Sequence, residues 1–367
     1  MNPQITLPDY GGANVRGIVP ALLGPHAGDL PAWIPAPVHG AGQVVLLVLD
    51  GLGWEQLRAN AKSAPVLSSM EGGPITTVAP STTATALTSI ATGLTPGEHG
   101  LVGYRIEVGR STLNVLRWNT DAGDARRQHE PSTLQPFAPF LGEAVPVVSK
   151  AELEGSGFTL AHLRGVRQVG WRAASSIPVT VGQLLAAGER FVYAYYDGID
   201  KIAHERGFGP FYEAELAAAD RLVGEILEVL APGAVLLVTA DHGQVHVGGN
   251  TLSPSPDVLR LTRHGSGEGR FRWLHARPGA AAELLAAAAD AHRDVAWVVS
   301  REQVIDDGWL GPVVSPPVAA RLGDVALVAH APVSFDDPAD GGPYPLVCRH
   351  GSLTSAEMLV PLLAAGR

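Results

Sequence analysis

The sequence predicts an α/β fold in which a central, mostly parallel sheet is flanked by helices and carries an inserted cap region. Two observations predict it. Short apolar runs rich in β-branched residues are typical of buried parallel strands. Segments with apolar residues at helical spacing alternate with these runs, which places helices on both faces of one sheet. The four predicted strands are residues 43–49, 190–196, 234–240 and 324–330.

The predicted helices carry recognisable end signals. Gly93 follows the first of them and suits the position after a helix C-terminus. Pro210 opens the second and suits the first helical position. Pro361 lies inside the last and would bend or shorten it. The four predicted helices are residues 81–92, 210–230, 279–292 and 355–365.

Two long stretches interrupt this alternation, and we interpret them as insertions that form a cap beside the carboxyl edge of the sheet. Parallel α/β sheets bind their ligands at that edge, so the insertions would lie next to any site. Divided in this way, the chain has three core parts, residues 1–104, 186–250 and 321–367, and two insertions, residues 105–185 and 251–320.

Composition excludes several classes of function. The formal net charge of −10 argues against binding to a nucleic-acid polymer, which needs a basic face. No apolar run approaches the roughly 20 residues of a membrane-spanning helix, and no basic segment followed by an apolar one marks a signal peptide. The single cysteine, Cys348, excludes an internal disulfide. We therefore expect a cytoplasmic protein without a membrane span; the sequence does not indicate its oligomeric state.

Carboxylates, imidazoles and hydroxyls recur where the predicted strands end. Taken singly, each has an ordinary explanation: an Asp after a strand is usually a turn residue, a lone His is usually structural, and Ser or Thr often caps a helix. Asp200 and His204, four residues apart, suit a salt bridge as well as a metal site. Their conjunction at one sheet edge is what predicts a site. The candidates are Asp50, Ser81, Thr82, Thr83, Asp197, Asp200, His204, Asp241, His242 and His350.

These residue types suit phosphoryl transfer assisted by metal ions. Zn²⁺ accepts imidazole nitrogen and carboxylate oxygen together. Two such ions about 4 Å apart can clamp the attacking and leaving oxygens of an in-line displacement. A nearby cation would also lower the pKa of a threonine hydroxyl, which is otherwise a poor nucleophile. A hydroxyl at a helix N-terminus is well placed to meet a bound anion.

The motifs that carry these residues resemble the alkaline phosphatase superfamily, and within it the type I phosphodiesterase/nucleotide pyrophosphatase family. The resemblance covers the core, about two-thirds of the chain, and does not extend to the insertions. It is carried by the Asp200–His204 pair and by VLDGLG (48–53), PSTTATALTSIATGLTPGEHGLVGY (80–104), TADHG (239–243) and RHGSLTSAEMLVPLL (349–363).

The resemblance implies hydrolysis of phosphodiester or pyrophosphate bonds in a small phosphorylated substrate. It implies two sites for Zn²⁺, with other divalent metals as the alternative. One would be held by Asp200, His204 and His350 and the other by Asp50, Thr83, Asp241 and His242. Thr83 would be the nucleophile; if the alignment to the family shifts by one residue, Thr82 takes this role. Water would then hydrolyse the phospho-threonine intermediate.

One departure from the family pattern bears on the substrate. The family has Phe-Pro-Asn after the nucleophile, and the Asn donates to a phosphate oxygen; this chain has Ala84, Thr85 and Ala86 there. Asn119, Asn250 or the amide of Ala84 could replace that donor. Tyr104, Trp118 and Trp171 could stack on a leaving group or pack in the core.

Two other functions stay open at this point. A phosphomonoesterase of the same superfamily would need extra positive charge for its substrate, and Arg105, Arg117 and Arg263 are available. A non-catalytic domain that binds a phosphorylated ligand is the third reading, although the full ligand set argues against it.

Overall fold

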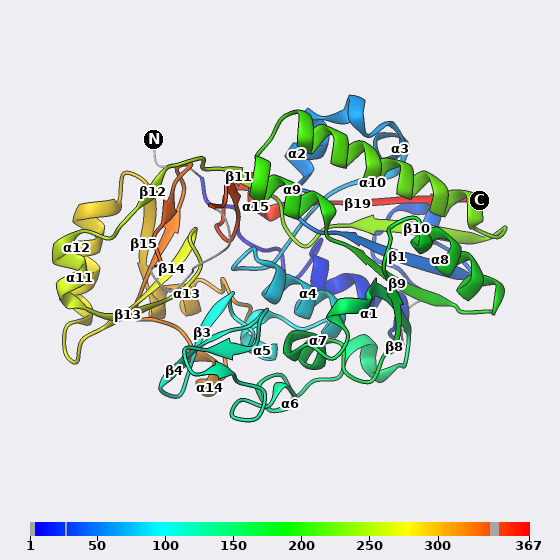
Figure 1. The fold of residues 1–367 in the computed structure, drawn as a ribbon. Helices are drawn as coiled ribbons and strands as arrows, with labels where there is room; N and C mark the ends of the chain where they lie inside the picture. Colours follow the sequence, from blue (N-terminus) through cyan, green and yellow to red (C-terminus); the bar gives the residue numbers. More distant parts are fainter. Residues whose placement is uncertain (1–3, 26–27, 338–344) are drawn as a thin grey trace.

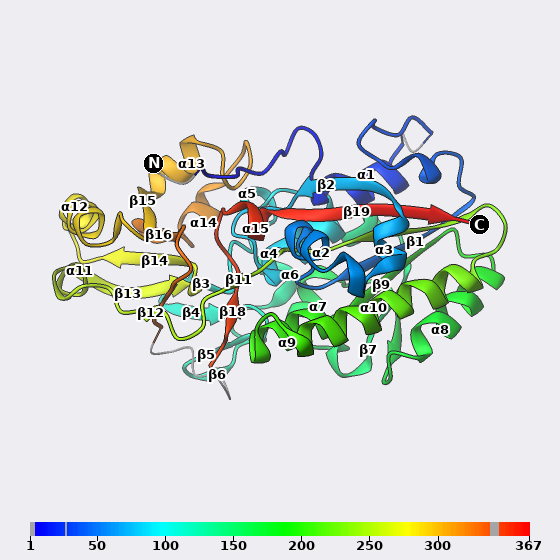
Figure 2. The same cartoon turned by 90° about the horizontal axis from the view of Figure 1, so that it is seen from above.

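A seven-stranded sheet forms the centre of the larger part of the molecule (Figures 1 and 2). The computed structural model describes residues 4–25, 28–337 and 345–367. Five adjacent strands run parallel, and the two at one edge are joined to them through an antiparallel pairing. In order across the sheet the strands are β2 (Glu71–Thr76), β19 (Leu359–Gly366), β10 (Ala234–Thr239), β1 (Gln43–Leu49), β9 (Phe191–Tyr196), β7 (Pro146–Lys150) and β8 (Arg167–Trp171).

Helices cover both faces of this sheet, which confirms the expected α/β architecture (Figure 1). On one face α10 (Pro210–Val229) packs against α8 (Ser176–Ala186), α9 (Gly198–Arg206) and α3 (Pro65–Ser69). On the other, α4 packs against its neighbours around buried apolar side chains. The remaining helices of this part are α1 (Ile18–Leu23), α2 (Trp54–Ala59), α4 (Thr83–Thr92), α5 (Pro96–His99), α6 (Pro131–Leu134), α7 (Gly157–His162) and α15 (Ser355–Met358).

A smaller antiparallel sheet stands beside the main one and has its own apolar core (Figure 1). Its strand order is β13 (Thr262–Gly267), β14 (Phe271–Ala276), β16 (Val325–Ala329) and β15 (Ala296–Ser300). The accompanying helices are α11 (Pro256–Leu261), α12 (Ala281–His292), α13 (Arg301–Asp306) and α14 (Pro316–Ala319).

A third sheet and two short strand pairs complete the described chain. The third sheet is formed by β3 (Arg105–Val108), β4 (Ser111–Asn114), β5 (Asn119–Thr120) and β6 (Gly123–Asp124). The pairs are β11 (Val245–His246) with β18 (Cys348–Arg349) and β12 (Thr251–Leu252) with β17 (Ser334–Phe335).

The structure differs from the expected organisation in two of the predicted elements. Residues 355–365 are a short helix followed by strand β19, because this segment fills the gap between β2 and β10 and its apolar side chains are buried on both faces. Pro361 is tolerated there because it lies opposite Pro74 and one residue beyond the pairing with β10. The predicted strand 324–330 forms, as β16, but in the small sheet.

The first insertion is also not wholly separate from the core. Strands β7 and β8 lie within residues 105–185 and extend the main sheet beyond β9. Their runs are short, and in β8 only the last residue is fully buried, so the sequence shows no strong apolar strand signal there.

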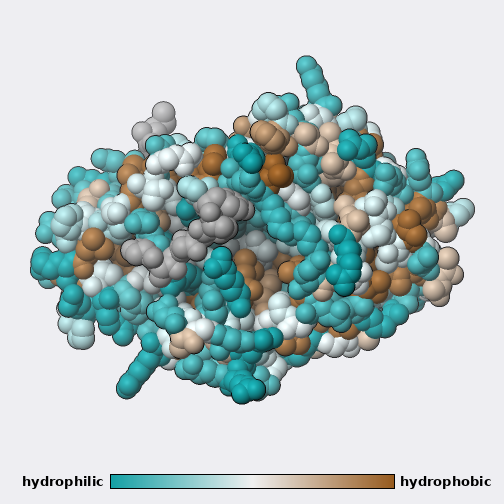
Figure 3. Space-filling view, viewed as in Figure 1, coloured by the Kyte–Doolittle hydropathy of each residue, from teal (hydrophilic) through white to brown (hydrophobic). Residues whose placement is uncertain are grey.

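The molecular surface mixes hydrophilic and hydrophobic residues, as expected when most apolar side chains are buried. Brown, hydrophobic atoms are scattered among teal ones on the face shown in Figure 3. Among the described residues, no helix combines the length and the apolar character needed to cross a bilayer.

Candidate active site

Three parallel strands deliver the acidic residues of the site to one edge of the sheet. Strand β1 lies between β9 and β10, with Leu49 opposite Tyr196 and Val48 opposite Thr239. The segments that follow the three strands therefore start side by side. Asp50 follows β1 directly, Asp241 lies two residues beyond β10, and α9 starts just after β9 and carries Asp200 and His204 on one face.

Thr83 is the first residue of α4, at the end that faces these carboxylates. Thr82 occupies the N-cap position, but its side chain makes no cap hydrogen bond. Ser81 does not cap the helix either: its hydroxyl donates to the Ser352 carbonyl at 2.6 Å and accepts from the Gly351 amide at 3.2 Å. The suggested capping role for Ser81 or Thr82 is therefore wrong, and Ser81 instead anchors the loop that carries His350.

The first group of side chains gathers around His242. Its Nε2 lies 3.1 Å from Thr83 Oγ1, 3.4 Å from Asp241 Oδ2 and 3.6 Å from Asp50 Oδ1. All four side chains are buried, although Thr83 keeps 8% of its surface exposed. The structure thus brings together the four residues expected at one metal site.

The second group gathers around Asp200. Its Oδ1 lies 3.2 Å from His204 Nε2 and 3.9 Å from His350 Nε2. The His350 ring stacks on that of His242, with centroids 3.6 Å apart, so the two groups adjoin. The three residues expected at the other metal site are therefore also together.

All three imidazoles turn the same nitrogen toward the site. The Nδ1 atoms of His204, His242 and His350 lie 2.7, 3.0 and 3.0 Å from backbone carbonyl oxygens. A carbonyl only accepts, so each Nδ1 carries the proton, and each Nε2 presents a lone pair. This is the arrangement that fixes a histidine as a metal ligand.

The carboxylates and imidazoles perturb one another. Burial, followed by the charges of Asp241 and Asp200, raises the pKa of Asp50 well above its ordinary value. Burial likewise raises the pKa of Asp200 and Asp241. Burial lowers the pKa of His242, and that of His350 well below its ordinary value.

These features fit a pair of divalent cations. Within the described residues, Asp50 Oδ1 and Asp241 Oδ2 are buried without a hydrogen-bond partner, which is costly unless a cation contacts them. Two sets of donor atoms lie close enough to share an ion: Asp50, Asp241 and His242, and Asp200, His242 and His350. Nitrogen and carboxylate donors of this kind suit Zn²⁺.

The suggested substrate-binding residues lie in the first insertion or directly before it. Trp118 is buried in the first insertion, where its indole N–H donates to the His129 carbonyl at 2.7 Å. Asn119 pairs with Asn114 and Asp124 in the third sheet, and Tyr104 lies half-buried before β3. Their role in binding stays a prediction.

Two supporting residues were missed in the sequence. The Tyr195 hydroxyl donates to Asp50 Oδ2, and the Gln244 amide donates to Asp200 Oδ1 at 2.8 Å. Both belong to strands or loops already singled out, but nothing in the sequence shows which residue of a strand faces a ligand. Asp197 is not a ligand of either group: Lys150 and Lys201 each lie 2.6 Å from its carboxylate.

The loop that carries His350 is fixed by a buried ion pair from the small sheet. Arg270, at the turn between β13 and β14, donates to Glu357 at 2.7 and 2.9 Å, and both side chains are fully buried. Glu357 in turn accepts from the Ser352 amide at 3.0 Å and from the Thr354 hydroxyl at 2.5 Å. The small sheet therefore helps to position His350.

Replacing Tyr195 by phenylalanine should weaken Zn²⁺ binding by about 10–100-fold, because Asp50 loses the donor that orients its carboxylate. Competition with a chromophoric chelator measures the affinity. Tyr196→Phe is the matched control, since the neighbouring Tyr196 hydroxyl donates to Glu215 instead. Equal Zn²⁺ affinity in the two variants would show that the Tyr195 contact does not support the ligand.

Comparison with known proteins agrees with this geometry. The family model of type I phosphodiesterase / nucleotide pyrophosphatase matches residues 44–353, which is most of the chain. The chain belongs to this family. It is accordingly a hydrolase of the phosphodiesterase and nucleotide pyrophosphatase type, as its motifs indicate. A search of curated proteins found no match.

Solved structures of similar fold include two kinds of protein. Murine ectonucleotide pyrophosphatase / phosphodiesterase 5 is 15% identical, with a TM-score of 0.64 over 89% of this chain and 88% of that one. The human protein of the same name is 16% identical, with a TM-score of 0.65 over 88% of each chain. Phosphonoacetate hydrolase from Sinorhizobium meliloti 1021 is 17% identical, with a TM-score of 0.65 over 89% of this chain and 90% of that one. At these identities the likeness concerns the fold of this phosphodiesterase-family chain.

Proposed function

We propose that this enzyme hydrolyses phosphodiester or pyrophosphate bonds through a phospho-threonine intermediate on Thr83, at a site that holds two Zn²⁺ ions. The observation that carries the proposal is the meeting of two adjoining donor groups at the Thr83 hydroxyl. Asp50, Asp241 and His242 would hold one ion together with Thr83. Asp200, His204 and His350 would hold the other.

Each side chain has a role that follows from its place. Thr83 Oγ1 attacks phosphorus, and the bond between phosphorus and the leaving-group oxygen breaks; water then attacks phosphorus and releases Thr83. Bound zinc would lower the pKa of the attacking hydroxyl and offset phosphate charge. The N-terminus of α4 adds favourable potential for the anion, and the Ala84 amide is the proposed replacement for the missing Asn donor.

The comparisons support this assignment of Thr83. A structure of murine ectonucleotide pyrophosphatase / phosphodiesterase 5 is described as an inactive threonine-to-alanine variant in complex with AMP. A threonine whose replacement by alanine gives an inactive protein is what the proposed mechanism requires. By analogy, we propose a small phosphorylated substrate such as a nucleotide diester for this chain.

Diester or pyrophosphate substrates are favoured over monoesters by the engagement of the arginines. Arg105 lies 3.2 Å from Asp337, and Arg263 lies 3.1 Å from Glu107. The charges of these two guanidinium groups are offset by carboxylates, although the side chain of Arg263 is 56% exposed; Arg117, the third arginine considered, is exposed in the first insertion. A set of test substrates should therefore include nucleotide diesters, and also phosphonoacetate, because a hydrolase of that compound shares the fold.

The intermediate can be tested directly. Acid quenching during turnover of a nitrophenyl phosphodiester, followed by peptide mass spectrometry, should find Thr83 esterified to a phosphoryl group that still carries the ester group not displaced. The same adduct on Thr82 would move the nucleophile by one residue. An unmodified 80–93 peptide under conditions of rapid turnover would contradict a threonine intermediate.

A cytoplasmic location also remains part of the proposal. The sequence contains a single cysteine, Cys348, which cannot form an internal disulfide, whereas proteins of oxidising compartments often carry disulfides.

A further inference from the structure

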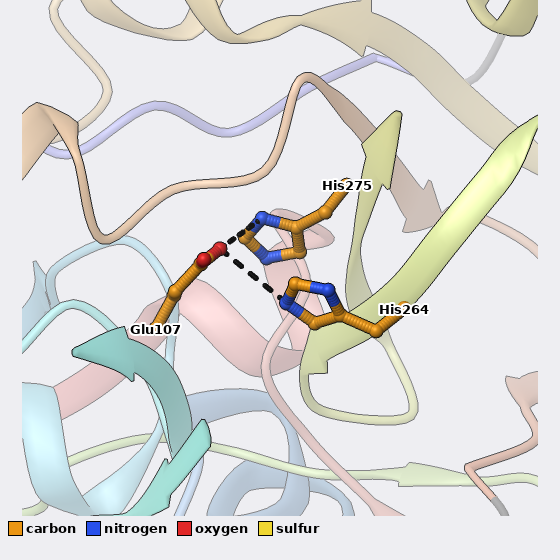
Figure 4. Close-up of side chains that lie close together, drawn as sticks. All are labelled: Glu107, His264 and His275. Atoms are coloured by element: carbon orange, nitrogen blue, oxygen red, sulfur yellow. Dashed lines mark ion pairs between the residues drawn. The ribbon is translucent and has the colours of Figure 1, made fainter. Parts of the chain in front are cut away.

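A second cluster of metal-binding side chains lies where the third sheet meets the small sheet. Glu107 comes from β3, whereas His264 and His275 come from β13 and β14 and are direct cross-strand partners. Figure 4 shows both imidazoles directed at the Glu107 carboxylate, and dashed lines mark the two contacts. Residues from both insertions thus converge on one carboxylate oxygen, outside the groups around Thr83.

The distances within the cluster are short. Glu107 Oε2 lies 2.5 Å from His275 Nδ1 and 3.3 Å from His264 Nε2. The side chains of Glu107 and His275 are 12% and 3% exposed, whereas that of His264 is 31% exposed. The two rings stack with centroids 4.1 Å apart. The cluster is therefore closed on the inside and open to solvent at His264.

We propose that Glu107, His264 and His275 bind a divalent transition-metal ion of the Zn²⁺ type. The three donors are two nitrogens and a carboxylate oxygen that lie within 4.8 Å of one another. The open side at His264 leaves room for water as a fourth ligand, which completes the usual tetrahedron. The site stands independently of the proposed function, since it shares no residue with the groups around Thr83.

The donor spacing suits such an ion. Ligands about 2.0–2.1 Å from a tetrahedral Zn²⁺ lie about 3.3 Å from each other. The separation of Glu107 and His264 already has this value, while the hydrogen bond between Glu107 and His275 must lengthen and the stacked rings must splay. Glu107 is free to shift, because its other oxygen contacts only the exposed Arg263 among the ion pairs described.

A neighbouring hydroxyl is placed to orient His275 as a ligand. Ser266 Oγ lies 2.8 Å from His275 Nε2. When Nδ1 gives its lone pair to an ion, Nε2 carries the proton and donates it to this hydroxyl, so the ring keeps one proton throughout. Such a second partner fixes the tautomer of a metal-ligating histidine.

The charges around the cluster also favour neutral imidazoles. Burial, with the nearby His264, Arg263 and Arg301, lowers the pKa of His275 to about 3, and burial lowers that of His264. Arg105 and Arg272 also lie in this region, and their guanidinium groups form ion pairs with Asp337 at 3.2 and 2.6 Å. Neutral imidazoles beside a carboxylate are ready to bind a cation without first losing a proton.

An ion here would join the two insertions. It would link β3 of the first insertion to the β13–β14 hairpin of the second, and the turn of that hairpin carries Arg270, the partner of Glu357. The expected role is structural support for the wall beside the active site, with no part in the chemistry at Thr83.

The test compares zinc content after equilibrium dialysis of the full chain at a buffered free Zn²⁺ concentration, with protein-bound zinc measured by elemental mass spectrometry. His264→Gln should bind one equivalent less than the wild type. Glu107→Gln, as a second variant at the less exposed carboxylate, should show the same loss. His39→Gln replaces an exposed histidine elsewhere and should bind as much as the wild type.

The difference between wild type and variant is the deciding quantity, so it does not depend on how many ions the active site holds. Equal zinc content in the wild type, His264→Gln and Glu107→Gln would overturn the proposal, even if the metal sites beside Thr83 were fully occupied by zinc. A loss of one equivalent in both variants would support it, even if the protein proved inactive toward phosphodiesters.

Discussion

Replacing Thr83 by alanine should lower kcat/KM for a nitrophenyl phosphodiester by roughly 10³-fold or more, because the nucleophile is lost and water must attack directly. The fold should survive, since alanine is a good first residue for a helix and the Thr83 side chain has His242 as its one hydrogen-bond partner in the described structure. Initial rates with wild type and variant, at matched zinc content, measure the effect.

Thr82→Ala is the matched control. Thr82 is equally buried and lies beside Thr83, but its side chain makes no cap hydrogen bond. It should keep most of the activity. A Thr83→Ala enzyme as active as the wild type would exclude Thr83 as the nucleophile, and a loss confined to Thr82→Ala would assign the reaction to the neighbouring residue.

Removal of bound metal should also lower activity by roughly 10³-fold or more, and added Zn²⁺ should restore it. Without cations, the carboxylates of Asp50, Asp200 and Asp241 face one another with Asp50 Oδ1 and Asp241 Oδ2 unpaired. Dialysis against a strong chelator, followed by titration with Zn²⁺, tests this. Because His264→Gln lacks the proposed additional site, it should respond in the same way as the wild type.

The stability of the metal-free protein should also depend on pH. A carboxyl whose pKa is raised on folding stabilises the protein most at low pH, and that stability is lost as pH rises from 3.8 toward the folded value. His242 and His350 have lowered pKa values, so the stability that they contribute increases as pH rises. That increase ends at the ordinary imidazole pKa of 6.5. The carboxyls therefore lower the stability of the metal-free protein as pH rises above 3.8, and the two histidines oppose this loss up to pH 6.5.

Zinc needs deprotonated ligands, so the gain in Tm on adding Zn²⁺ should be larger at about pH 8 than at about pH 5.5. Differential scanning calorimetry of the metal-free and reconstituted protein measures it. A gain that is independent of pH, or full activity after verified removal of metal, would contradict a site built from these buried carboxylates and imidazoles.

The sequence predicted the position of the site better than its surroundings. Residues 43–49, 190–196 and 234–240 are buried strands with one chain direction, so residues that follow them had to meet at one edge. That rule brings Asp50, the Asp200–His204 pair and the Asp241–His242 pair together. His350 and the hydroxyls of residues 81–83 were candidates as well, but the ligand role of His350 and the choice of Thr83 as nucleophile rested on motif resemblance, because no local pattern places a loop or a helix start against a sheet edge.

The elements that escaped prediction depend on contacts between distant segments. Residues 355–365 have helical spacing, yet β19 forms because pairing with β2 and β10 outweighs the local preference. Likewise, the sequence does not reveal that Tyr195 points toward Asp50, since every residue of β9 from Phe191 to Tyr195 is buried. Which buried side chain meets which ligand is decided by strand register and twist.

The buried pair of Arg270 and Glu357 limits how this enzyme can be re-engineered. Arg270 also donates to the carbonyls of Ala329, Ala331 and Val333, so one guanidinium binds the small sheet and the His350 loop into a single unit. Removing one member would leave a buried charge unmatched, which is strongly destabilising. Grafting the β13–β14 region from a relative to change substrate preference would therefore succeed only if the acidic partner of the C-terminal loop is transplanted with it.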